Sequence, residues 1–85
     1  MHYITLQQFC TFHRVEPVLI HEFIDYGIIE LPAEEREVTV IPESQIPRIE
    51  RALRLRNELE VNSAGIHIIL RLLDQLESRG PVEDV

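Results

Sequence analysis

The sequence predicts a mainly α-helical domain of the winged helix-turn-helix type, with about four helices and a small two-stranded wing. Apolar residues recur at helical spacing in several segments. Proline or glycine stands near most boundaries between those segments, and one short segment alternates apolar and polar residues. A chain of 85 residues builds a single core. We therefore expect one domain at residues 1–80, followed by a flexible tail at 81–85.

The first helix is expected at Thr5–His13, "TLQQFCTFH". Thr5 is a suitable N-cap, and Gln8 three positions later completes a capping-box pattern. The apolar face of this helix is formed by Leu6, Phe9, Cys10 and His13.

The second helix is expected within "EPVLIHEFIDYG", from Glu16 to Gly27. Pro17 suits the first helical position, because its missing N–H would be unpaired there, and Gly27 ends the helix. The buried stripe consists of Leu19, Ile20, Phe23 and Ile24. The opposite face carries Val18, His21, Glu22 and Asp25.

The wing is expected directly after the second helix. Ile28 and Ile29 lead into it, and Val38 and Val40 alternate with polar residues as in a strand with one buried face. The polar segment 31–36 would turn the chain back between these two parts. An isolated hairpin is marginal, so we expect the wing to pack on the helices.

A third helix is expected to begin between Ser44 and Pro47, because proline is tolerated only in the first turn. Its inner face comprises Ile49, Ala52, Leu53, Leu55 and Leu59. Asn62 and Ser63 offer an N-cap for a fourth helix, which Gly80 and Pro81 end. The apolar residues of this last helix are Ile66, Ile69, Leu70, Leu72, Leu73 and Leu76.

The net charge of −7 disfavours nucleic acid as a partner, because nucleic-acid binders usually carry a basic surface. All eight basic residues are arginine, and the third helix holds half of them: Arg48, Arg51, Arg54 and Arg56. These four are the best argument for DNA binding. Glu50 and Glu58 on the same helix are expected to neutralise much of that charge.

Other features bound the location and the chemistry. The single cysteine cannot form an internal disulfide, and no signal-peptide pattern is present, so we expect a cytoplasmic protein. The apolar runs are far shorter than the roughly 20 residues that span a bilayer, so no membrane segment is expected.

Neither catalysis nor a metal site is expected. Cys10, His13 and His21 form a metal-ligand trio only on paper, and scattered residues of these types more often fill core and surface positions. Ser44 and Ser63 lie at expected helix starts, where capping explains them. We expect no enzyme activity and no cofactor.

Three segments carry a resemblance to a known family. They are "RALRLRNELEVNSAGIHIILRLLDQL" (51–76), "QFC" (8–10) and "DYGIIE" (25–30). In this order and spacing they resemble the CbpM chaperone-modulator family, whose fold is a winged helix-turn-helix like that of MerR regulators. "EVNSAGI" is also similar to the corresponding turn in heat-shock repressors of the MerR superfamily.

The resemblance implies a protein that binds the J-domain of a DnaJ/CbpA-type co-chaperone and inhibits its stimulation of Hsp70 (DnaK). DNA-binding MerR relatives carry arginine and tyrosine on the outer face of the second helix, where this sequence has Val18, His21 and Glu22. Carboxylates there would repel phosphates and suit a basic partner. The resemblance also implies such a partner, since J-domains carry a basic second helix.

We therefore assign partner binding to Glu16, Val18, His21, Glu22 and Asp25. Two alternatives remain open at this point. In the first, Glu22 and Asp25 form only the solvated side of an amphipathic helix and bind no partner. In the second, the protein is a MerR-like DNA-binding transcriptional regulator. A long dimerising coiled coil is missing after the fourth helix, so a homodimer would have to form through that helix itself.

Overall fold

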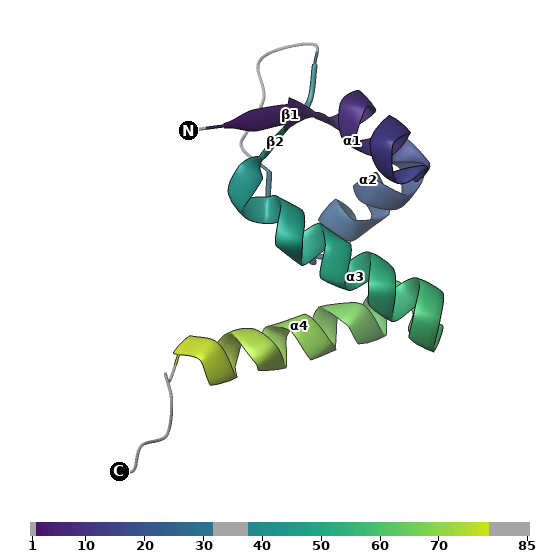
Figure 1. The fold of residues 1–85 in the computed structure, drawn as a ribbon. Helices are drawn as coiled ribbons and strands as arrows, with labels where there is room; N and C mark the ends of the chain where they lie inside the picture. Colours follow the sequence, from purple (N-terminus) through teal and green to yellow (C-terminus); the bar gives the residue numbers. More distant parts are fainter. Residues whose placement is uncertain (1, 32–37, 79–85) are drawn as a thin grey trace.

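The computed structural model describes residues 2–31 and 38–78. The order of elements is β1 (Tyr3–Thr5), α1 (Leu6–His13), α2 (Pro17–Asp25), β2 (Val40–Pro42), the 3-10 turn η1 (Glu43–Gln45), α3 (Ile46–Leu59) and α4 (Ser63–Ser78). Helix α3 runs through the middle of the molecule, with α1, α2 and the sheet on one side and α4 on the other (Figure 1). The predicted mainly helical fold with four helices and a two-stranded sheet is confirmed.

Local sequence signals fix the ends of the first two helices. Thr5 caps α1 in a full capping box: its hydroxyl accepts from the Gln8 N–H, and the Gln8 side chain accepts from the Thr5 N–H, both at 3.0 Å. Pro17 opens α2 as expected. Gly27 follows α2 with φ of +74°, a conformation in which glycine is favoured. The ends of the two helices in the helix-turn-helix unit are therefore set by residues close to them in the sequence.

The pairing predicted for the wing is wrong. Ile28 and Ile29 are not in a strand; both are buried in the core. Strand β2 instead pairs antiparallel with β1, with Ile4 opposite Ile41. Because Ile28 and Ile29 are buried in the core, β2 pairs with Tyr3–Thr5, a segment of aromatic and β-branched residues that suit a strand.

Part of the predicted wing and the predicted tail lie outside the described residues. The turn expected at 31–36 falls almost wholly there, and so do 79–80 and the tail at 81–85. Val38, expected on the buried face of a strand, is exposed and precedes β2.

One continuous apolar core joins the elements. Its largest fully buried side chains are Phe9, Ile20, Phe23, Ile28, Ile29, Ile41, Ile49, Ile66 and Leu70. Every helix contributes to this cluster, as does β2, so the domain has one core.

Leu59 is an exception to the predicted inner face of α3. It is 67% exposed, because α3 ends there and Glu60 turns the chain in a left-handed conformation with φ of 56°. Val61, after the turn, packs against the core instead.

The two phenylalanines of α1 provide a matched test of the core. Phe9 is fully buried, whereas Phe12 is 79% exposed on the same helix. We expect Phe9→Ala to lower the free energy of unfolding by about 3–5 kcal/mol, because it removes buried surface and leaves a cavity. Phe12→Ala should change it by less than about 0.5 kcal/mol. Urea denaturation followed by circular dichroism measures both, and equal losses would contradict the assigned orientation of α1.

Candidate functional site

The outward face of α2 is displayed as the sequence predicted. Ile20 and Phe23 are fully buried, which turns Val18, His21 and Asp25 toward solvent. Val18 is 67% exposed, so an aliphatic side chain lies open among polar neighbours. Glu16 is at the N-cap position of α2; its side chain makes no capping hydrogen bond and is also exposed. This arrangement leaves an apolar residue and acidic groups available to a partner.

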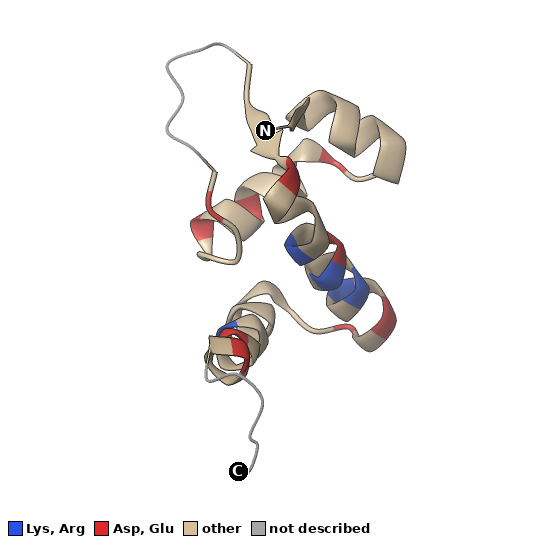
Figure 2. Ribbon diagram, turned by 60° about the vertical axis from the view of Figure 1, so that its left-hand side comes forward, with Lys and Arg blue, Asp and Glu red and all other residues tan. Residues whose placement is uncertain are grey.

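Helix α2 contains no lysine or arginine between Pro17 and Asp25. Acidic residues lie on α2, while arginines follow the length of α3 (Figure 2). A helix that reads DNA needs cationic or amide side chains toward phosphates and base edges. The outer face of α2 lacks the cations.

Glu22 differs from the other predicted site residues. It is half-buried, and its carboxylate accepts a hydrogen bond from the hydroxyl of Ser63, the buried first residue of α4. This contact joins the second helix to the fourth. Glu22 therefore has a structural contact in addition to its place at the edge of the outer face.

The role predicted for Ser63 as a cap is wrong. The neighbouring Asn62 does the capping, since its Oδ1 accepts from the Gly65 N–H at 2.8 Å. Ser63 is turned inward to Glu22 instead. These two residues are 41 positions apart, so no spacing rule in the sequence points to the contact.

A groove between α2 and α3 brings together three of the five predicted residues. Glu16, Val18 and Glu22 line one side of it, and Leu53, Arg56 and Asn57 of α3 line the other. His21 and Asp25 are not part of its lining; both are exposed on α2. The contribution of α3 was missed by sequence reasoning, because it depends on how two helices cross.

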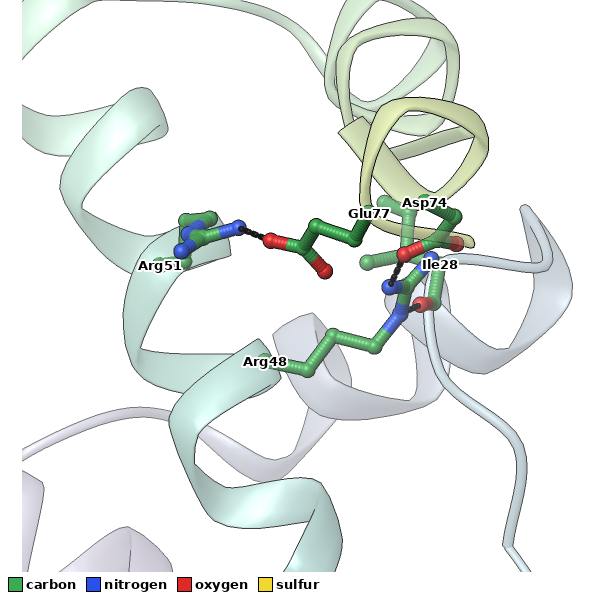
Figure 3. Close-up of polar contacts among 5 residues, drawn as sticks. All are labelled: Ile28, Arg48, Arg51, Asp74 and Glu77. Carbon is green, nitrogen blue, oxygen red and sulfur yellow. Dashed lines mark hydrogen bonds and ion pairs between the residues drawn. The ribbon is translucent and has the colours of Figure 1, made fainter. Parts of the chain in front are cut away.

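The arginines of α3 divide into two groups. Arg48 Nη1 lies 2.8 Å from Asp74 Oδ1, and Arg51 Nη1 lies 3.7 Å from Glu77 Oε2, so both reach acidic residues of α4 (Figure 3). Arg48 Nε also donates to the Ile28 carbonyl. The side chains of Arg54 and Arg56 make no ion pair or hydrogen bond with residues 2–31 or 38–78. Two of the four cations are thus paired with acidic residues of α4.

The neutralisation expected within α3 takes another form. Glu50 does not pair with Arg54; its Oε2 lies 3.7 Å from His13 Nε2 on α1. The charges of α3 therefore connect it to neighbouring helices. Because these pairs are partly exposed, each contributes no more than about 1 kcal/mol to stability.

Cys10 and His13, two of the three candidate metal ligands in the sequence, have other contacts. Cys10 is buried, and burial raises the pKa of its thiol. The His13 ring packs on Phe9 with ring centroids 4.1 Å apart. Within the described part of the chain no group of three or more His, Cys, Asp or Glu side chains is placed to hold a metal ion.

None of the helices described is long and apolar enough to cross a membrane.

Comparison with known proteins identifies the family to which this chain belongs. Residues 4–79 match the MerR HTH family of regulatory proteins. The chaperone modulatory protein CbpM of Escherichia coli O1:K1 / APEC is 32% identical over 73 residues, which cover 85% of this chain and 71% of that protein. CbpM of Escherichia coli O139:H28 (strain E24377A / ETEC) matches to the same extent. The chain belongs to the CbpM family of MerR-like helix-turn-helix proteins. Neither the MerR HTH family nor CbpM is named as an enzyme.

The Glu22–Ser63 contact can be tested by substitution. Ser63→Ala leaves a half-buried carboxylate without its hydroxyl donor, so we expect the free energy of unfolding to fall by about 1–3 kcal/mol. Ser78→Ala is the control, because that hydroxyl donates to the Gln75 carbonyl at an exposed position of the same helix. Urea denaturation of both variants measures the difference. A Ser63→Ala protein as stable as the control would show that the contact has no structural role.

Proposed function

We propose that this protein is a chaperone modulator that binds the J-domain of a DnaJ/CbpA-type co-chaperone and inhibits its stimulation of Hsp70 (DnaK). The observation that carries the proposal is the outer face of α2. In a DNA-binding relative this helix would be cationic; here it carries Glu16, Val18 and Asp25 in exposed positions and no cation. The relationship to chaperone modulatory proteins supports the same conclusion.

Charge complementarity explains how the surface would select its partner. Exposed carboxylates attract a basic surface over a distance of about one Debye length, roughly 8–10 Å at moderate salt, and so raise the rate of encounter. Once the surfaces meet, Val18 supplies apolar contact that excludes water between them. A J-domain held in this way would have its basic helix covered, and Hsp70 could not use that surface at the same time.

DNA binding is the second candidate, and one observation favours it. Arg54 and Arg56 are exposed on α3, and neither is paired with another described residue. Two cations give a small footprint, since specific DNA-binding proteins commonly make about 6–10 phosphate contacts. Any binding to duplex through these arginines should weaken steeply with salt.

The decisive experiment is calorimetric titration of the protein with the J-domain. We expect a dissociation constant in the micromolar range or tighter, and we expect Asp25→Lys and Glu16→Lys each to weaken binding by about tenfold or more, equivalent to about 1.4 kcal/mol. Glu22 is avoided because its substitution would also break the contact with Ser63. Glu43→Lys is the matched control, as this exposed carboxylate belongs to η1 and not to α2.

Two readouts separate the candidates. The wild-type protein should suppress J-domain-stimulated ATP hydrolysis by Hsp70, and the Asp25→Lys variant should do so less. A random duplex and a promoter-derived duplex serve as the DNA arm, titrated at two salt concentrations. Absence of J-domain binding together with salt-sensitive duplex binding would refute the modulator proposal in favour of a regulator.

We also propose that the outer face of α4 is a homodimer contact. Ile68, Leu72 and Leu76 are 57%, 54% and 60% exposed and recur every four residues, so they form one apolar stripe. Asp74 and Glu77 are turned toward α3, so the acidic groups of α4 do not oppose a second copy. The side of α4 away from α3 faces away from the rest of the domain (Figure 1).

Sedimentation equilibrium tests this contact. We expect the wild-type chain to form dimers and Leu72→Asp to sediment as a monomer, because a carboxylate would be buried in the apolar stripe. Leu59→Asp provides the control, since Leu59 is also more than half exposed but lies at the end of α3. A monomeric wild-type protein at high concentration would rule the contact out.

A further inference from the structure

The groove between α2 and α3 has a second charged side that the acidic-face proposal does not use. Arg56 lines it from α3, and Arg14 lines it from the turn between α1 and α2. Both side chains are exposed. Neither makes an ion pair or hydrogen bond with another residue of the described ranges, in contrast to Arg48 and Arg51. Two guanidinium groups thus remain available in a chain with a large excess of acid.

The acidic residues of the groove do not satisfy these cations. Glu22 lines the same groove as Arg56, yet its carboxylate accepts from the Ser63 hydroxyl and makes no ion pair with Arg56. Glu16 likewise lies beyond ion-pair distance of Arg14 and Arg56. The groove therefore has an acidic edge on α2 and a basic edge formed by Arg56 on α3, and Arg14 lines the same groove from the turn before α2.

Apolar side chains lie between the charged residues of the groove. Leu19 and Leu53 contribute to its lining beside Val18. Its volume is about 290 Å³, which is at the lower limit of the range of roughly 300–1,000 Å³ typical of small-molecule sites. The space suits a few inserted side chains of a protein better than a separate ligand.

We propose that this groove receives a carboxylate side chain of the partner protein on Arg56, while the partner's basic side chains meet α2. Arginine is well matched to this role, because its planar guanidinium binds a carboxylate through two parallel hydrogen bonds. The partner segment must then carry an acidic residue close to its basic ones, next to an apolar side chain that reaches Leu19 and Leu53. The inference rests on the proposed function, since it concerns the same partner.

Opposite charges on the two edges would fix the orientation of the partner. A purely acidic surface attracts any basic helix in either direction, whereas a groove with one acidic and one basic edge opposes the reversed arrangement by like-charge repulsion. Arg56 is in this sense a specificity-determining residue. It would distinguish among basic partners that the acidic face alone accepts equally.

The test uses Arg56→Glu and Arg56→Gln in the full chain, titrated with the J-domain by calorimetry at constant salt. We expect Arg56→Glu to weaken binding by at least tenfold and Arg56→Gln by less. Arg54→Glu is the matched control: the same charge change on the same helix, at an exposed arginine that does not line this groove. It should weaken binding by no more than threefold. Circular dichroism and thermal unfolding establish that each variant is folded.

Charge exchange then identifies the contact. Each Asp and Glu of the J-domain is changed to Lys in turn, and one of these variants should bind Arg56→Glu at least fivefold more tightly than the unchanged J-domain does. Equal losses for Arg56→Glu and Arg54→Glu, or the absence of any rescuing variant, would overturn this inference but leave the modulator proposal standing. Absence of wild-type binding to the J-domain would overturn both.

Discussion

The surface of this protein depends on the burial of one face of α2. Ile20 and Phe23 are fully enclosed by the core, and burial of each contributes about 1.5–3 kcal/mol. The helix cannot rotate without exposing both side chains, so the residues on its other face are held toward solvent. The core therefore fixes which groups are displayed, but not their charge. Residues on that face are free to match a partner at little cost in stability.

The distribution of charge follows from a second feature, the contact between α3 and α4. Arg48 and Arg51 reach Asp74 and Glu77 across this contact, and Arg48 also binds the Ile28 carbonyl just beyond α2 (Figure 3). These pairs are partly exposed, so they add little energy. Their larger effect is to pair two arginines of α3 with carboxylates of α4, so that these two cations are not free to bind a partner. Among the residues that the structure describes, the outer surface is then acidic on α2 and apolar along the outer stripe of α4. Exposed arginines without an ion pair to a described residue remain at Arg14, Arg54, Arg56 and Arg71.

How much of this was predictable depends on the range of each interaction. The capping box of α1, Pro17 at the start of α2 and Gly27 after it act within a few residues, and each was read correctly from the sequence. The period of α2 also gave its inner and outer faces. Strand pairing, in contrast, depends on segments far apart, and the strand that pairs with β2 precedes α1. A local reading placed it after α2 and was wrong.

The candidate site shows the same division. Val18, His21 and Asp25 follow from helical periodicity alone and lie outward as expected. The hydrogen bond between Ser63 and Glu22 and the lining of the groove by Arg56 join residues from different helices, and no spacing in the sequence encodes them. Helical spacing predicts an inward position for Leu59, because it follows the apolar residues of α3 at regular intervals. The helix ends at that residue, so its last turn extends past the core and Leu59 is exposed.

The pairing of β1 with β2 has a consequence for the order in which the domain folds. The sheet closes a loop that contains both α1 and α2, and the entropy of closing that loop must be overcome before the paired strands stabilise anything. The two helices, whose contacts are local, are expected to form and pack first. The sheet would then join last, and the bond from the Leu6 N–H to the Thr39 carbonyl would lock the start of α1 to it. Changes near Tyr3 should accordingly alter the rate at which the native state opens more than the surface that α2 presents.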